Sequence, residues 1–343
     1  MPNQYGGIMS GQITVNIYCD ESKDKKDENG NKWDYYGLLI VPAEKERELL
    51  KRILNCRCLL RGEWVQEGCQ FDCGYHKENN TEISYKDIKR YSEFRIAEKW
   101  IDLIFDNNRN NLDMIYFYIL GIDKSKINHQ FWKHYSDVGS QIYTRFFITG
   151  VKGIKFFFNK HKEILINKII HDSNSLLTGS DKYYYLSLIS ELSKDTKIRL
   201  QNSNNFNIEH VFSDHRKSRK MESHFLQFVD LILGVTVNYI HFTAKNNPKK
   251  IALTEKLYPL LCRLIERPKN VNSSYKYYRR QQIQFFPSRR DFYQRIQALD
   301  GSISKVPYED LFYTNRRCLF KEEYLRTKGC IEKSKQPTLD KFY

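Results

Sequence analysis

Apolar and polar residues alternate in the first regular segment of the chain. In ITVNIYC (13–19) the odd positions are apolar, which is the period of a β-strand. A second apolar run, WDYYGLLIV (33–41), follows an Asn29-Gly30 turn signal. The pattern predicts a β-hairpin whose first strand runs directly into Asp20.

Helical spacing follows the hairpin. AEKERELLKRILN (43–55) predicts a helix, and another is expected from near Tyr85. KMESHFLQFVDLILGVTVNYIHF (220–242) predicts a long helix with an apolar stripe of Leu226, Val229, Leu233 and Val237. Further strands are predicted at 112–123, 152–159 and 206–215. Interspersed strands and helices favour an α/β fold, with a mixed sheet flanked by helices.

Several carboxylates sit where these elements end. Asp20 and Asp214 close predicted strands, and Asp230 lies inside the apolar helix. A buried carboxylate is costly unless it is paired, and a salt bridge would satisfy a single one. Several acids sharing one pocket repel each other, and a divalent metal relieves that repulsion. The pattern therefore points to a metal site as well as to simple ion pairing.

Five segments, in order over residues 13–240, resemble the DUF3800 family, which is placed with the RNase H-like fold. They are IYCDES, YYGLLIV, TEISY, ILGIDKSKINH and SDHRKS…LQFVDLILG. The resemblance implies phosphodiester hydrolysis at a two-metal Mg²⁺ or Mn²⁺ site. The catalytic and metal-binding residues it implies are Asp20, Glu82, Asp214 and Asp230. Family members often carry Asp where this chain has Asn159, so one ligand is expected to be missing, with Asp214 compensating or the site weakened.

A cysteine-rich insertion spans residues 56–76. It contains Cys56, Cys58, Cys69 and Cys73, and thiolates are preferred ligands of zinc. Cys-x-Cys followed by Cys-x₃-Cys is not a common zinc-finger spacing. A structural Zn²⁺ and a set of partly buried thiols therefore both stay open.

Positive charge gathers toward the C-terminus. The net charge is +15, and residues 245–343 hold 22 Lys and Arg against 10 Asp and Glu. Basic residues alternate there with aromatics, which suits phosphate neutralisation and base stacking, although a solubilising surface has the same composition. The predicted nucleic-acid contacts, to DNA in the first place, are Arg279, Arg280, Arg289 and Arg290.

The chain ends on QPTLDKFY (336–343). Gln336, Leu339, Phe342 and Tyr343 fit the peptide motif that binds the PCNA-type sliding clamp, in which a single helical turn places apolar anchors in a groove. The alternative is that the two aromatics pack on their own domain. Clamp binding would place the protein in replication, repair or defence, in an archaeal or eukaryotic type of setting.

Four parts are expected: an N-terminal extension (1–12), an RNase H-like domain (13–244), a basic, aromatic-rich helical extension (245–330) and a flexible tail (331–343). No membrane span or signal peptide is predicted, which indicates an intracellular protein, cytoplasmic (archaeal nucleoid) or nuclear. The leading function is a metal-dependent nuclease. The alternatives are a non-catalytic, clamp-tethered nucleic-acid adaptor and a ribonuclease that acts as a defence effector or toxin.

Overall fold

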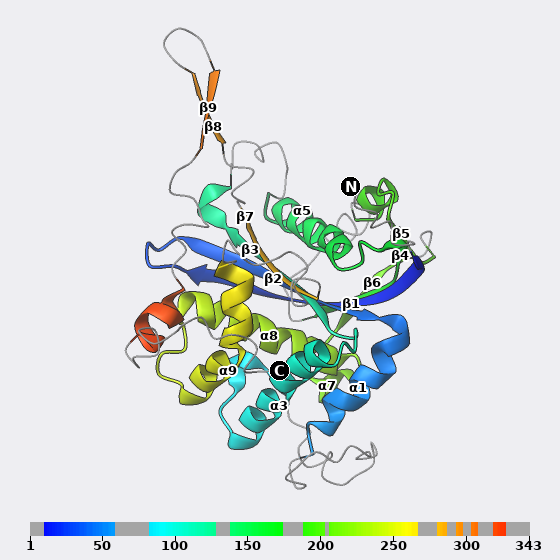
Figure 1. The fold of residues 1–343 in the computed structure, drawn as a ribbon, viewed down its shortest axis with the longest axis vertical. Coiled ribbons are helices and arrows are strands. Elements are labelled where there is room, and N and C mark those ends of the chain that lie inside the picture. The colour runs from blue at the N-terminus through cyan, green and yellow to red at the C-terminus, as the bar shows by residue number, and fades with distance from the viewer. Residues whose placement is uncertain are drawn as a thin grey trace, which may run out of the picture.

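A mixed β-sheet with helices on both faces forms the centre of the protein (Figure 1). The structure is a computed structural model. It describes residues 10–58, 82–127, 138–173, 188–202, 206–266, 280–286, 293–297, 303–307 and 318–326. The predicted α/β class, with a mixed sheet flanked by helices, is confirmed.

Seven strands make up this sheet. They are β1 (Ser10–Lys26), β2 (Lys32–Pro42), β3 (Tyr116–Asp123), β4 (His161–Asp172), β5 (Ile198–Leu200), β6 (Ile208–Val211) and β7 (Gln281–Phe286). Their order is β5-β4-β1-β2-β3-β7, and β6 also pairs with β4. Only β2 runs antiparallel to its neighbours, so β1 and β4 are parallel and their C-terminal ends meet at one edge of the sheet.

The predicted hairpin is confirmed as β1 and β2, joined by a turn in which Gly30 has φ +77. The predicted alternation holds as well. Val15, Ile17 and Cys19 belong to one buried cluster, and Tyr18 belongs to the other. The two faces of the sheet therefore have separate cores, as expected for a sheet covered on both sides.

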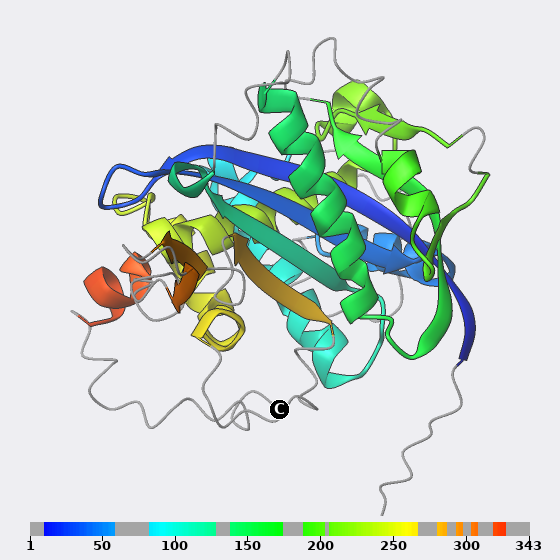
Figure 2. The same cartoon turned by 90° about the horizontal axis from the view of Figure 1, so that it is seen from above.

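The two faces are covered by different helices. One face carries α1 (Glu46–Asn55), α3 (Tyr91–Arg109), α8 (Ser223–His241) and α9 (Pro248–Glu266), and is called the α8 face. The other carries α5 (Val138–Gly153) and is called the α5 face. Figures 1 and 2 show α5 across the sheet from the four-helix layer, and the helical residues 188–193 pack on the same face as α5.

The long helix α8 is buried along almost its whole length. The predicted stripe of Leu226, Val229, Leu233 and Val237 is inside the core. Among the described residues, α8 is the one helix long and apolar enough to cross a membrane, but 89% of that window is buried inside the protein. Packing between the sheet and the outer helices accounts for its apolar composition.

A β-bulge in β4 changes which side chains face which core. Its pairing with β1 shifts between Val15–Ile166 and Asn16–Lys168, leaving Asn167 as the extra residue. Before the bulge, Ile164 and Ile166 face the α5 side; after it, Ile170 belongs to the α8-face core. Bulges commonly re-aim side chains in this way next to active sites. Asp172, two residues beyond Ile170, consequently lies on the α8 face.

Two predicted strands differ from the structure. Residues 152–159 are not a strand: they form the end of α5, the 3-10 turn η4 (Ile154–Phe156) and a further turn. Their apolar character comes from aromatic packing, because the Phe158 and Tyr116 rings lie 4.8 Å apart. The strand predicted at 206–215 is shortened to β6, and the short helix α7 (His215–Ser218) follows it.

The C-terminal extension, predicted as helical, is helical only in part. Helix α9 is followed by β7, which pairs with β3 and places Ile283 and Phe285 in the α8-face core. Strands β8 (Tyr293–Gln297) and β9 (Ile303–Pro307) form a separate hairpin, and a π-helical turn η7 (Phe320–Leu325) comes after it. The helical prediction missed β7 because the alternation in QQIQFF serves an existing sheet edge, which is a tertiary feature.

Candidate active site

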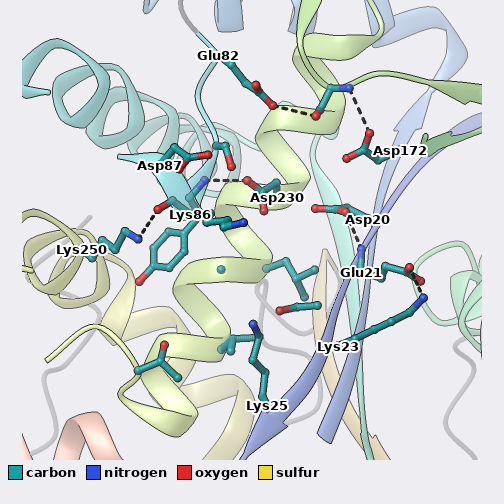
Figure 3. Close-up of a pocket in the computed structure, with 18 residues that line it drawn as sticks. Asp20, Glu21, Lys23, Lys25, Glu82, Lys86, Asp87, Asp172, Asp230 and Lys250 are labelled. Carbon is teal, nitrogen blue, oxygen red and sulfur yellow. Dashed lines mark hydrogen bonds and ion pairs between the residues drawn. The ribbon is translucent and has the colours of Figure 1, made fainter. Parts of the chain in front are cut away.

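An acidic cleft opens where β1, β4 and α8 meet the segment before η2 (Tyr85–Asp87). Its cavity volume is about 610 Å³. Figure 3 shows carboxylates from several elements around it. The acidic residues in its lining are Asp20, Glu21, Glu82, Asp87, Asp172 and Asp230.

Close packing of α8 against the hairpin brings Asp20 and Asp230 together. Asp20 pairs across the strands with Gly37. A Cβ on Gly37 would lie 3.3 Å from Val229 Cγ2 and 3.4 Å from Leu233 Cβ, which is tighter than ordinary contact. The missing side chain therefore lets α8 approach β2 where it carries its carboxylate toward β1.

Backbone amides hold one oxygen of each of the three aspartates. Glu21 N–H donates to Asp20 Oδ1 (2.7 Å) and Tyr85 N–H donates to Asp230 Oδ2 (2.7 Å). Ser213 N–H donates to Asp172 Oδ1 (3.2 Å). Three separate segments thus orient carboxylates from three elements, a fixed arrangement of the kind that ligand or metal sites need.

The aspartates influence one another strongly. Burial raises the pKa of Asp20, and the neighbouring carboxylates of Asp230 and Asp172 raise it further. Burial also raises the pKa of Asp230, against the opposing effect of its hydrogen bond from Tyr85 N–H. Each of these carboxylates therefore opposes ionisation of its neighbours when no cation neutralises them.

Glu82 completes the acidic rim of the cleft. Its Oε1 accepts a hydrogen bond from Ser213 Oγ at 2.9 Å. Burial raises the pKa of Glu82, and this hydrogen bond acts in the opposite direction. Ser213 thus contacts two acids, Asp172 through its N–H and Glu82 through its hydroxyl.

The spacing Gln227-x-x-Asp230 has a physical explanation. Gln227 Oε1 accepts from Ile83 N–H (2.9 Å), one helical turn before Asp230 accepts from Tyr85 N–H. Alternate amides of an extended segment therefore bind to side chains one turn apart on α8. These two hydrogen bonds to α8 place Glu82 beside the aspartates.

Gln227 also joins two further segments. Its Nε2 donates to Ser213 O (2.6 Å), and its Oε1 accepts from Arg57 Nη2 (2.6 Å). Arg57 is buried 5.3 Å from the Trp100 ring centre, and burial lowers its pKa to about 9. Gln227-x-x-Asp230 is one of the most specific parts of the family resemblance, although the sequence alone assigns no role to the Gln227 side chain.

Gly234 on α8 makes room for Tyr85. A Cβ at this position would lie 2.2 Å from Tyr85 Cγ and 2.5 Å from its Cβ. No side chain can occupy that space without moving the segment that donates to Asp230. A glycine in a helix costs stability, so its position here is explained by the close contact.

Three of the sequence-predicted acids, Asp20, Glu82 and Asp230, line the cleft, and Asp214 does not. The carboxylate of Asp214 accepts from Arg216 N–H (3.1 Å) and forms an ion pair with Arg216 Nε (2.9 Å) at the start of α7. That guanidinium holds the pKa of Asp214 below its usual range. Asp172 stands in the cleft at the strand-end position to which the sequence assigned Asp214.

The prediction that a metal ligand is missing at Asn159 also needs revision. Asn159 lies in a turn before β4, and its carbonyl accepts from Lys197 Nζ at 2.8 Å. Asn159 is not the end of a strand, so an Asn at this position does not mean that the acidic cluster lacks a ligand. The isoleucine-rich run EILINKII, followed by His171 and Asp172, is the signal that could have located the strand-end acid.

Other predicted residues lie elsewhere or outside the described residues. Arg280 is buried and paired with Asp113 (Nη2–Oδ1 2.5 Å), so little of its side chain is accessible for the predicted contact with DNA. Cys56 and Cys58 follow α1, and burial raises the pKa of the Cys56 thiol to about 12. The residues outside the described ranges are Cys69, Cys73, Arg279, Arg289, Arg290, Gln336, Leu339, Phe342 and Tyr343.

The donor set of the cleft suits a hard divalent cation. Asp20, Asp172, Asp230 and Glu82 offer only carboxylate oxygens, the ligands that Mg²⁺ and Mn²⁺ prefer. Within the described ranges, no three His, Cys, Asp or Glu side chains already stand in a metal-holding arrangement. Metal ligation would require these carboxylates to lose protons that their raised pKa values favour keeping.

Comparison with known proteins adds no relative. The chain matches no family model, and a search of curated proteins also finds no match. The functional argument therefore depends on the cleft itself.

Proposed function

We propose that the protein is a divalent-metal-dependent nuclease with an RNase H-like fold that hydrolyses phosphodiester bonds, with DNA as the first substrate to test. One observation carries the proposal: Asp20, Asp172 and Asp230 come from three different elements and line one cleft. Each has one oxygen held by a backbone amide. Burial and the neighbouring carboxylates raise the pKa of Asp20 and Asp230, and perturbed acids gathered in one cleft are typical of functional sites.

The order of acids along the chain supports the RNase H-like assignment. The resemblance to the DUF3800 family implies an acid on the first strand, one near a following helix, one at a later strand end and one on the last helix. Asp20 is on β1, Glu82 precedes α3, Asp172 ends β4 and Asp230 is on α8. The antiparallel β1–β2–β3 ribbon, with β4 parallel to β1, is compatible with the same fold.

Asp20, Asp172, Asp230 and Glu82 are the residues that would hold the metal ions. Two divalent cations, when bound, supply activation of water and stabilisation of the leaving oxygen. The protein's own contribution is orientation, because each aspartate is fixed by a backbone N–H. Lys23, Lys25, Lys86 and Lys250 also line the cleft and supply positive charge for a phosphate backbone.

Recruitment by a PCNA-type sliding clamp is a separate part of the proposal. It is supported by the sequence of the tail, with Gln336, Leu339, Phe342 and Tyr343 at motif spacing. Deleting residues 336–343 is expected to abolish binding to a clamp in a pull-down assay and to leave cleavage of short oligonucleotides unchanged. Clamp binding that survives the deletion would exclude this role for the tail.

The non-catalytic adaptor is the weaker alternative. Its basis was a ligand lost at Asn159, and Asn159 lies in a turn outside the cleft lining. Asp172 supplies the strand-end carboxylate in the cleft, so the Asn at position 159 is no argument for a decayed site.

The deciding experiment is a cleavage assay on labelled single-stranded, duplex, branched and hybrid substrates with Mg²⁺ or Mn²⁺. Cleavage is expected in the wild type and not in Asp20→Asn, Asp230→Asn or EDTA. Asp214→Asn is the matched control, because Asp214 is a nearby buried aspartate that lies outside the cleft lining. Equal loss of activity in Asp214→Asn, or activity that resists EDTA, would contradict the proposed site.

A further inference from the structure

The acidic cleft does not end at the carboxylates. A second cavity, also of about 610 Å³, lies next to it, and the two share Tyr85, Thr243 and Lys250 in their linings. The second cavity is further lined by Phe242 and Lys245, in the connection between α8 and α9. Because these three residues line both, the two cavities are considered together and called the α8 groove.

One face of α8 forms the floor of this groove. Asp230, Leu233, Gly234 and Val237 line the first cavity at the i, i+3, i+4, i+7 spacing of a single helical face. The groove then reaches Phe242, which ends the helix. The helix advances about 18 Å from Asp230 to Phe242, which is the rise of about five stacked nucleotides of one strand.

Lysines stand on both sides of the floor. Lys25 comes from β1 and Lys250 from α9, and Figure 3 shows them on the two sides of α8. The floor between them is apolar beyond Asp230, with Leu233, Gly234 and Val237, although Leu233 and Val237 are almost fully buried and present only a little of their surface. Apolar surface beside positive charge suits unpaired nucleotides, whose base faces and phosphates are both accessible.

Lys250 is held in place where the two cavities join. Its Nζ donates to Lys86 O at 2.8 Å and lies 5.0 Å from the centre of the Tyr85 ring. These contacts fix the ammonium group and leave it in the lining of both cavities. A lysine ordered in this way loses little further freedom on binding an anion.

We propose that the α8 groove binds a single nucleic-acid strand flanking the scissile phosphate, and that Lys250 contacts the backbone phosphate of a flanking nucleotide. The inference rests on the proposed nuclease function and names its substrate class. Cleavage requires an unpaired segment on one side of the scissile bond, and Lys250 is a specificity residue that contributes to substrate binding.

Binding by Lys250→Met and Lys249→Met to labelled single-stranded DNA tests the proposal. Lys249 is the matched control, because it neighbours Lys250 on α9, donates to Lys89 O and lines neither cavity. Methionine keeps an apolar stem over Tyr85 and removes the charge. Dissociation constants are measured against salt concentration for a series of strand lengths, in EDTA so that binding is read without cleavage.

Lys250→Met is expected to weaken binding several-fold and to lower the slope of log Kd against log salt by about 0.7. The effect should vanish for strands too short to reach Lys250 from the carboxylates, and Lys249→Met should bind as wild type does. Equal weakening by both variants, or an effect of Lys250→Met that does not depend on strand length, would overturn the proposal.

The same proteins, assayed for cleavage with Mg²⁺, separate the two ideas. Cleavage that Lys250→Met leaves unchanged on long strands, with unchanged binding, would overturn the groove and leave the nuclease intact. Length-dependent binding through Lys250 without cleavage would support the groove and contradict the nuclease. A wild type that binds no single strand at all would overturn the groove directly.

Discussion

Two buried aspartates each end a strand of the same sheet, and only one of them lies in the cleft. Asp123 ends β3, and its Oδ1 accepts from Ser125 N–H (2.9 Å) and Ser125 Oγ (2.6 Å), which caps the 3-10 turn η3 (Lys124–Lys126). Asp172 ends β4, and its amide donor is Ser213, 41 residues away in the sequence. Asp123 therefore caps a turn of its own segment, whereas the carboxylate of Asp172 is held in the cleft by a distant segment.

Asp214 belongs with Asp123 in this comparison. Its carboxylate accepts from Arg216, two residues along, and begins α7. Among these three acids, the two with local donors lie outside the cleft lining and the one with a distant donor lies in it, although Asp20 in the cleft also accepts from its neighbour Glu21 N–H. The difference between Asp172 and the other two can be tested by substitution, because Asp→Asn keeps the size of the side chain and removes its charge.

The largest expected effect separates Asp172 from Asp123. Asp172→Asn should lower the cleavage rate at least about 100-fold, since even residues that only support metal ligands cost up to that much. Asp123→Asn should leave the rate per folded molecule unchanged and lower the free energy of unfolding by about 1 kcal/mol through the weakened cap. Cleavage rates and denaturant unfolding of both variants check this. Loss of activity in a folded Asp123→Asn protein would contradict the different roles given to Asp123 and Asp172.

Gly234→Ala should have the next largest effect, because it disturbs the hydrogen bonds between α8 and the segment that carries Glu82. The new Cβ would lie 2.2 Å from Tyr85 Cγ, so this segment must move. We expect the free energy of unfolding to fall by about 1–3 kcal/mol, as for overpacked cores, with a lower cleavage rate because Asp230 loses its Tyr85 donor. Gly11→Ala is the control, since nothing lies within 4 Å of a Cβ there. Equal stability of the two variants would contradict the packing argument.

The smallest expected effect concerns pH and the stability of the cation-free protein. Burial raises the pKa of Asp20 and Asp230, so the folded protein binds more protons than the unfolded chain above about pH 4, the ordinary range of Asp. Its stability should therefore fall as pH rises through the raised pKa values. In EDTA, Asp230→Asn should melt a few degrees above wild type at mildly alkaline pH and close to it near pH 4.

Added Mg²⁺ or Mn²⁺ sharpens this test. A cation that binds only the folded protein raises its melting temperature, so the wild type should gain stability and Asp230→Asn should gain less. A melting temperature of Asp230→Asn at or below that of wild type in EDTA at alkaline pH would show that the acids do not destabilise one another.

Local patterns predicted much of the fold. The alternation around Ile17, the turn at Gly30 and the apolar stripe of α8 each reflect the period of one element, and each is found in the structure. The order of strands could not be predicted in this way. The pairing of β7 with β3 joins residues more than 150 positions apart, and no local pattern encodes it.

The site was only partly predictable for the same reason. Asp20 and Asp230 stand out because they interrupt apolar segments, and a buried charge is unusual wherever it occurs. Asp172 follows an equally apolar strand, but the aromatic run KGIKFFFN before it was predicted as the strand, and this run belongs to the end of α5 and η4. Contacts across elements, such as Gln227 to Ile83 and Gly234 to Tyr85, emerge only from the packed structure.

The bulge at Asn167 has a consequence for how the sequence of this protein can change in length. If residues 164–172 alternated without the bulge, Asp172 would face the α5 side and His171 the cleft. A deletion of the one bulge codon would restore regular pairing with β1 and leave Asp172 facing the cleft. A deletion of two codons would exchange the acid for an imidazole in the cleft while keeping every residue of the strand end. Related sequences that keep the activity should therefore tolerate loss of one residue here and not of two.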